Sequence, residues 1–362
     1  MIERCWKRFL RRSGMSPWGL LGPPLWLASL LYRFVPGLHR RLTKERVRLS
    51  VPVIAVGNIT VGGTGKTPMV HLLARRLIDE GFRIGIVSAG WGRAGDEPIL
   101  DEGTGLQDRS ADDVGDEVLL LAHLVPQAVF SIHPSKSEGA RRLAACGERL
   151  DAVIVDDAFQ HYRLARDLDL VTYDAALPAR VLRPFPYGVM REPRSALRRA
   201  DIVVITRANF ARDIGRLSRR LCKISPRAAH YTAQFSISGL VGAERRYPVK
   251  YLEDKSVFLF AGVGNFEPLR RQVSVLAGDL DAALELSDHQ RYDAATLARI
   301  KRLADRHDSD VIVTTGKDWV KIRHFDFGRE LYYLAQSVDL DPGEEQLIAA
   351  IEDRLNLRKA GH

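Results

Sequence analysis

The chain has 362 residues, of which 46% are hydrophobic and 27% are charged, so its composition excludes a disordered or fibrous protein. This length is sufficient for two domains, each with its own core. The cysteines Cys5, Cys146 and Cys222 lie far apart and show no metal-binding spacing. This argues against a disulfide framework and a structural zinc site, and favours a reducing compartment.

The net charge of +9 originates at the N-terminal end of the chain. Residues 1–50 contain eleven Lys or Arg residues and only two acidic ones, so this segment accounts for the whole excess. A basic excess confined to one terminal arm, with no nucleic-acid-binding motif behind it, argues against a nucleic-acid partner. No feature of the sequence indicates an obligate protein partner.

The basic arm also contains the most apolar stretch of the chain. Residues 13–32 carry no charge and include aromatic side chains of the kind that lie at membrane interfaces. A Gly-Pro-Pro sequence at 22–24 interrupts this stretch and makes a spanning helix unfavourable. We therefore expect residues 1–45 to form a helical arm lying on an anionic membrane surface, at the cytoplasmic face of the inner membrane. An export signal and a core helix of the soluble domain are the alternatives.

A phosphate-binding loop is predicted between a buried strand at 51–57 and a helical pattern that follows it. A second strand is predicted at 83–88, which completes a β-α-β unit. The loop matches the nucleotide-binding pattern except that a threonine replaces its first glycine; its residues are Thr60, Val61, Gly62, Gly63, Thr64, Gly65, Lys66 and Thr67. In such loops backbone N–H groups surround phosphate oxygens, the lysine reaches the β and γ phosphates, and the hydroxyl binds Mg²⁺. The sequence therefore predicts an ATP-binding, P-loop NTPase-like parallel sheet domain of the α/β class.

Two carboxylates follow a second buried strand. The apolar run at 152–155 leads directly into Asp156 and Asp157. Ligands of open α/β sheets bind at the carboxyl ends of the strands, and carboxylates placed there can hold Mg²⁺ directly or through water. A turn cap is the alternative for this pair when it is considered without the loop.

Four segments, in this order, resemble the tetraacyldisaccharide 4'-kinase family. They are GNITVGGTGKTP at 57–68, DDAFQHYRLARDLDLVTYD from Asp156, MREP at 190–193 and LSDHQRY at 286–292. That family phosphorylates the 4'-hydroxyl of an acylated glucosamine disaccharide 1-phosphate during lipid A assembly. The resemblance covers nearly the whole chain and implies ATP and Mg²⁺ as cofactors and an acylated disaccharide 1-phosphate as substrate.

The resemblance also implies roles for individual residues. It places Lys66 and Thr67 at the ATP phosphates and Mg²⁺, and Asp156, Asp157 and Gln160 on the magnesium side. It places the remaining polar residues near the reacting phosphate or the substrate: His161, Arg191, Glu192 and Lys136. A surface ion pair is the alternative for Arg191 and Glu192.

The resemblance further implies an acidic general base in a Gly-Asp-Glu motif, paired with His289. The motif occurs twice, with Asp96 and with Asp116 as its acidic residue. Only the first is followed by a proline, as is usual in the family, but the second has the family-like separation from the Asp-Asp segment. We therefore assign Asp116 as the base and Asp96 to a surface loop. A capping or core role is the alternative for His289.

Some positions depart from the family pattern. The usual Ser-Arg-Gly-Tyr is replaced by a sequence with Ala89 and Trp91, and Thr-Glu-Lys-Asp is replaced by a sequence with Gly316. An arginine is replaced by Lys136, which keeps the charge but loses bidentate geometry. These changes bear on selectivity for the substrate more than on phosphate transfer.

We expect three parts: the arm at 1–45, the P-loop kinase domain at 46–230, and a smaller α/β domain at 231–362 that closes the active-site cleft. In this division Lys66 and His289 belong to different domains. One alternative function is a membrane-associated, partition-type ATPase switch, although that family needs a lysine where this chain has Val61. Another is a kinase of the same fold that acts on a different acylated sugar.

Overall fold

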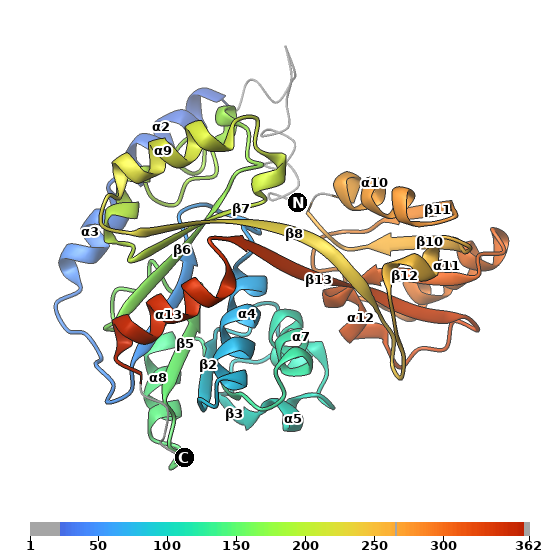
Figure 1. Cartoon of the computed structure of the whole chain (residues 1–362), viewed down its shortest axis with the longest axis horizontal. Helices are drawn as coiled ribbons and strands as arrows, with labels where there is room; N and C mark the ends of the chain where they lie inside the picture. Colours follow the sequence, from blue (N-terminus) through green and yellow to red (C-terminus); the bar gives the residue numbers. More distant parts are fainter. Residues whose placement is uncertain (1–21, 265, 358–362) are drawn as a thin grey trace. The chain divides into compact units, whose positions relative to one another are not determined.

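The computed structural model describes residues 22–264 and 266–357, and these residues form two compact units (Figure 1). Unit 1 consists of the chain up to Val87, the segment Lys136–Gln234 and the chain from Leu340 onward. Unit 2 consists of Ser88–Ser135 and Phe235–Asp339. Both units are therefore built from segments that are distant in the sequence.

The sheet of unit 1 is parallel, with the strand order β8-β7-β6-β1-β5-β2. Its strands are β1 (Val53–Asn58), β2 (Ile84–Ser88), β5 (Ala152–Asp156), β6 (Leu168–Asp174), β7 (Ile202–Thr206) and the first part of β8 (Ala229–Val241), up to Gln234. Every residue of the first five is buried, as expected for continuous runs of β-branched residues covered on both faces. The central position of β1 places the phosphate-binding loop at the middle of the sheet's carboxyl edge.

The helices of unit 1 are α2 (Gly22–Tyr32), α3 (Val35–Leu42), α4 (Lys66–Asp79), α8 (Lys136–Ala144), α9 (Ile214–Ile224) and α13 (Glu344–Leu355). Short 3₁₀ helices lie at Ala179–Val181, Arg194–Arg199 and Ala208–Phe210. The C-terminal helix α13 packs beside α4 and β6 although it is far from both in the sequence (Figure 1). Glu344 at its start lies within 4 Å of both Arg75 and Arg76 of α4.

Four strands of unit 2 are parallel and lie in the order β11-β10-β12-β13. These strands are β10 (Ser256–Ala261), β11 (Asp279–Glu285), β12 (Val311–Thr315) and β13 (Glu330–Asp341). Alternate residues of β10 enter two apolar clusters: Val257 and Leu259 pack in one, and Phe258 and Phe260 in the other. An antiparallel pair, β3 (Ile99–Glu102) with β4 (Val129–Ile132), belongs to the same unit, and the short β9 (Arg246–Tyr247) pairs with β8.

The helices of unit 2 are α5 (Gly103–Leu106), α6 (Ala111–Val114), α7 (Asp116–Leu124), α10 (Phe266–Leu276), α11 (Ala294–Arg306) and α12 (Gly316–Ile322), with a 3₁₀ helix at Val249–Leu252. Helices α7 and α12 pack against each other. Because α7 begins at Asp116 and α12 carries two lysines, this packing brings carboxylates and ammonium groups together.

The expected α/β fold, with a P-loop NTPase-like and mostly parallel sheet, is confirmed. The chain passes from unit 1 to unit 2 at 234–235, near the expected boundary at residue 230. Residues 88–135 group with Phe235–Asp339, and the chain from Leu340 onward groups with the phosphate-binding loop. Asp116 and His289 therefore belong to one unit, although the expected boundaries separate them.

Part of the N-terminal arm can be compared with its prediction. Residues 1–21, which include Cys5 and the first part of the apolar stretch, lie outside the described residues. The rest forms α2 and α3, in which only Gly22 and Ser29 are buried, so these helices contribute little to a core. Within residues 22–264 and 266–357, no helix has both the length and the apolar character needed to cross a membrane.

Candidate active site

The phosphate-binding loop connects β1 to α4. Two of its glycines have positive φ angles, 103° at Gly62 and 84° at Gly65, a conformation that costs glycine little. A Cβ atom added at Gly62 or Gly63 would meet no other atom within 4 Å, so the loop backbone borders open space. Lys66 and Thr67 are the first two residues of α4, where backbone N–H groups and the helix dipole favour anions.

Hydrogen bonds with side chains at the ends of three strands hold the phosphate-binding loop in place. Asn58 Nδ2 donates to Thr64 Oγ1 at 2.8 Å, and Thr64 Oγ1 lies 2.7 Å from Thr172 Oγ1. Thr206 Oγ1 donates to the Thr64 carbonyl at 2.8 Å, and Arg207 Nη2 donates to the Gly63 carbonyl at 2.9 Å. Since these partners lie at the ends of β1, β6 and β7, the sheet itself positions the loop.

The start of the loop is held by an extended neighbouring segment. Thr60 forms a β-bridge with Met190, and the Val61 N–H donates to the Val189 carbonyl at 2.7 Å. An extended, bridged residue needs no glycine, which explains why threonine is tolerated at this position. The Val61 N–H is thus already paired within the protein. The bridge also places Arg191, whose N–H donates to Ile59 O, beside the loop.

Asp157 is the centre of a group of positive charges. Lys66 Nζ lies 3.4 Å from Asp157 Oδ1, and Arg191 Nη1 donates to both carboxylate oxygens at 3.1 and 3.0 Å. Lys136 Nζ donates to the Asp157 carbonyl at 2.6 Å. Burial opposes ionisation of Asp157, but these three cations outweigh it and hold the pKa of that carboxyl well below its usual range. Asp157 also has φ of 50°, a backbone strain that is characteristic of functional sites.

Gln160 and Glu192 form a supporting network. Gln160 Nε2 donates to Asn58 O at 2.8 Å and to Glu192 Oε1 at 2.9 Å. Arg199 contacts both oxygens of Glu192, each at 2.9 Å, and the Glu192 side chain is only 4% exposed. Glu192 therefore holds neighbouring groups in place, whereas Gln160 Oε1 is buried with no hydrogen-bond partner among the described residues.

His161 lies in the loop after β5 and contacts the start of α8. Its Nε2 accepts the Ser137 N–H at 3.2 Å. Burial, followed by the charges of Lys136 and Arg166, lowers the pKa of His161 to about 4. The imidazole is therefore neutral near pH 7 and supports the helix that carries Lys136.

The donor set at this edge of the sheet suits Mg²⁺. The described residues contain no cluster of three or more His, Cys, Asp or Glu side chains. Magnesium at phosphate sites needs no such cluster, because one or two carboxylates, a hydroxyl, water and the phosphates complete its shell. Asp156, which is buried at the end of β5, Asp157 and the Thr67 hydroxyl provide these ligand types.

Unit 2 contains a second polar cluster around Asp116, the first residue of α7. Its side chain is 6% exposed, and its Oδ2 lies 2.9 Å from His289 Nδ1 and 2.9 Å from Lys321 Nζ. Its Oδ1 is buried with no hydrogen-bond partner among the described residues. The indole of Trp91, which is 69% exposed, lies with its ring centroid 4.8 Å from that of His289.

These contacts shift the pKa values of both Asp116 and His289. The hydrogen bond that His289 Nδ1 donates to Asp116 raises the pKa of His289. Burial would raise the pKa of Asp116, but the hydrogen bond from His289 and the charge of Lys321 hold it well below its usual range. Asp116 is therefore an ionised acceptor whose Oδ1 is the unoccupied atom. The other candidate, Asp96, lies exposed in the loop before β3.

Comparisons with known proteins agree with this geometry. A family model described as Tetraacyldisaccharide-1-P 4'-kinase matches residues 21–356. The chain belongs to the tetraacyldisaccharide 4'-kinase family. A family member from Syntrophus aciditrophicus is 37% identical over 344 residues, covering 88% of this chain and 89% of the relative. One from Geobacter metallireducens is 38% identical, covering 76% of this chain and 80% of the relative.

A solved structure of the same family supports the fold and the nucleotide. The crystal structure of LpxK from Aquifex aeolicus in complex with ATP has a TM-score of 0.71 and 26% identity, covering 93% of this chain and 99% of that one. The chain is therefore a P-loop NTPase-like kinase that uses ATP, with Mg²⁺ as the usual metal of such enzymes. The partition-type ATPase is set aside by these matches.

Several residues of the two clusters were not among those predicted from the sequence. Lys321 and Lys317 of α12 contact Asp116 and Glu117 of α7. The two lysines lie four residues apart, so they occupy one face of a helix. That spacing is the only sequence signal for them, and it does not indicate which carboxylates they meet. In unit 1, Arg207 contacts Gly63, which is distant in sequence, and Arg199 contacts Glu192, seven residues before it; neither pairing was predicted.

One family departure has a packing explanation. A Cβ atom added at Gly316 would come within 2.9 Å of Leu120 Cδ1, so glycine permits close packing of α12 on α7.

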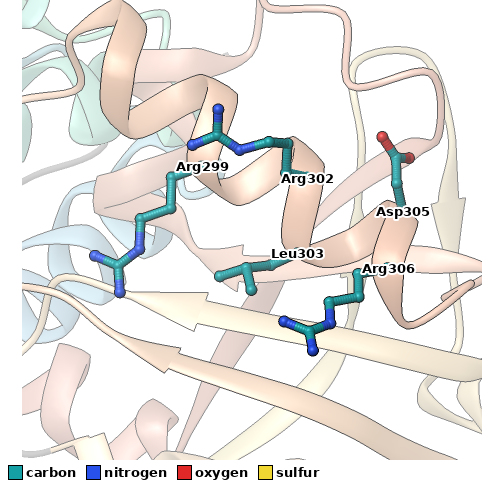
Figure 2. A pocket seen from close by; sticks show the side chains of 5 residues that line it. All are labelled: Arg299, Arg302, Leu303, Asp305 and Arg306. Atoms are coloured by element: carbon teal, nitrogen blue, oxygen red, sulfur yellow. The ribbon is translucent and has the colours of Figure 1, made fainter.

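The described pocket on α11 is separate from all of the predicted residues. It is lined by side chains of that helix alone, with Arg299 and Arg306 on either side of Leu303 (Figure 2).

Proposed function

We propose that the chain transfers the γ-phosphate of ATP to the 4'-hydroxyl of a tetraacylated glucosamine disaccharide 1-phosphate. The observation that carries this proposal is the carboxylate of Asp116, which is fixed through one oxygen and unoccupied at the other. Family membership supports the same reaction, because the relatives are named tetraacyldisaccharide 4'-kinase.

The residues of unit 1 bind and orient the nucleotide in this proposal. The loop N–H groups and Lys66 contact the phosphates, and Lys66 exchanges its pairing with Asp157 for one with the nucleotide. Thr67, Asp156 and Asp157 are the residues that would hold Mg²⁺, which neutralises charge on the phosphates when bound. Arg191 and Lys136 add positive charge beside Asp157.

Asp116 acts as the general base. Its Oδ1 accepts the proton of the 4'-hydroxyl while the hydroxyl oxygen forms a bond to the γ-phosphorus. The bond between the γ-phosphorus and the β-γ bridging oxygen breaks, and ADP leaves. Because the transition state is loose, little proton transfer is needed early, so a carboxylate with a depressed pKa suffices. His289 orients Asp116 through Oδ2.

Membrane attachment through the arm belongs to the same proposal. Leu31, Phe34 and Leu38 are 71%, 67% and 57% exposed, and basic side chains lie in the last turn of α3. Such helices bind bilayer surfaces by apolar burial and by attraction to anionic lipids. The arm would hold the enzyme at the cytoplasmic face of the inner membrane, where an acylated substrate presents its sugar head group.

The direct test follows label from γ-labelled ATP to the disaccharide in detergent micelles with Mg²⁺. We expect a bisphosphorylated lipid with label at the 4' position, and no label with Lys66→Ala. Labelling of another acylated sugar, but not of this disaccharide, would assign a different acceptor. Hydrolysis of ATP without any labelled lipid would contradict the kinase reaction.

A further inference from the structure

Lys321 shares one oxygen of Asp116 with His289. Its ammonium group lies 2.9 Å from Asp116 Oδ2, and the hydrogen bond from His289 Nδ1 to the same oxygen is also 2.9 Å. The Lys321 side chain is 12% exposed, and its Nζ also donates to the Gln290 carbonyl at 3.2 Å. Lys321 is therefore anchored to the loop that carries His289 as well as to the carboxylate.

This arrangement fixes the direction of the other oxygen. A rotation of the Asp116 carboxylate would break two charge-assisted hydrogen bonds at once, and such bonds are about twice as strong as neutral ones. Oδ1 is the buried atom that remains without a partner among the described residues. With two donors on Oδ2, Oδ1 is the carboxylate oxygen that is left to accept a hydrogen bond.

We propose that Lys321 is a positioning residue of the phosphate transfer, holding Asp116 Oδ2 together with His289 so that Oδ1 receives the substrate proton. This inference rests on the function proposed above. It adds a third member to the pair of Asp116 and His289, with a distinct task. His289 holds the carboxylate from the loop that carries it, whereas Lys321 holds the same oxygen from α12.

The charged surroundings of Asp116 determine the expected pH dependence. The titratable groups around it are His289 and Asp288 in one loop, Lys317 and Lys321 on α12, Glu117 on α7, and Tyr292. Loss of the Lys321 charge removes one of the interactions that keep Asp116 ionised, so the pKa of Asp116 rises. The acid limb of the pH–rate profile, where protonation of Asp116 lowers the rate, should therefore move to higher pH.

The test compares Lys321→Met, Lys321→Arg and the control Lys301→Met in the full-length enzyme, with labelled ATP and the disaccharide lipid in micelles. Lys301 is a half-buried lysine of α11 whose Nζ donates to Asp326 O at 3.5 Å. We expect Lys321→Met to lower kcat by about tenfold or more, as misplacement of a reacting group does, with the KM for ATP unchanged. Lys321→Arg should restore part of kcat, and Lys301→Met should match the wild type.

A second readout is independent of turnover. With histidine-selective labelling, NMR titration of unliganded Lys321→Met should show a higher pKa for His289, because the imidazolium no longer shares Asp116 Oδ2 with another cation. An unchanged kcat and acid limb, or an unchanged His289 titration in a folded variant, would overturn the positioning role. If the wild type fails to label the lipid while the titration shifts as expected, the proposed function fails and the contact of Lys321 with Asp116 stands.

Discussion

Individual hydroxyl groups beneath the phosphate-binding loop determine its shape. Thr64 is 2% exposed and connects three strand ends: its side chain contacts Asn58 and Thr172, and its carbonyl accepts from Thr206. Removal of one hydrogen-bonding group from such a buried layer lowers the free energy of unfolding, because the remaining partner stays desolvated and unpaired. These buried hydrogen bonds therefore preform the loop.

Thr64→Val keeps the shape of the side chain but removes the acceptor of Asn58 Nδ2. We expect a loss of about 1–3 kcal/mol in the free energy of unfolding, the usual cost of a buried unpaired polar group, and a higher KM for ATP. Urea unfolding and steady-state kinetics measure the two effects. The matched control is Thr104→Val, because Thr104 is exposed and should change stability by less than about 0.5 kcal/mol. Equal effects of the two substitutions would contradict the role of the buried layer.

At the scale of elements, α2 and α3 have an unusual surface for helices of a folded domain. No residue of α3 is buried, and large apolar side chains of both helices and of the turn between them are exposed: Trp26, Leu27, Leu31, Phe34, Val35, Leu38 and Leu42. An exposed apolar surface of this extent indicates an interaction site. The basic residues beside it favour an anionic bilayer as the partner.

The double substitution Phe34→Ser and Leu38→Ser tests this surface. Each large apolar side chain contributes about 1.5–3 kcal/mol when fully buried, so we expect binding to anionic vesicles to weaken by at least about tenfold. Co-sedimentation with phosphatidylglycerol vesicles is the measurement. Val275→Ser is the control, since Val275 of α10 is 83% exposed but lies outside the arm. Unchanged sedimentation of the double variant would exclude α2 and α3 as the membrane contact.

The elements that could be predicted are those whose sequence signal lies in continuous residues. The glycine-rich loop, the buried strand before Asp156 and the motif around His289 are read from continuous residues, and the structure has β1, β5 and the Asp116–His289 hydrogen bond at these places. Lys321 could not be assigned in this way. Its importance depends on α12 packing against α7, a contact between residues about two hundred positions apart.

At the scale of the whole molecule, the two chemical tasks lie in two separate units. The phosphate-binding residues belong to unit 1, whereas Asp116, His289 and Lys321 belong to unit 2. A division by continuous sequence assigns residues 88–135 to the nucleotide domain, because composition does not reveal which compact unit a segment joins. The discontinuous composition of unit 2 explains how a motif at 115–117 and a motif at 288–290 can build one rigid cluster.

This separation gives the central claim a direct test, in which ATP binding and phosphate transfer are measured side by side for Asp116→Asn and Asp96→Asn. We predict that Asp116→Asn binds ATP as the wild type does and loses transfer to the disaccharide by at least about a hundredfold, the usual contribution of a general base. Asp96→Asn, at an exposed loop position, should retain both. Wild-type transfer by Asp116→Asn, or an equal loss in Asp96→Asn, would contradict the assignment of Asp116 as the base.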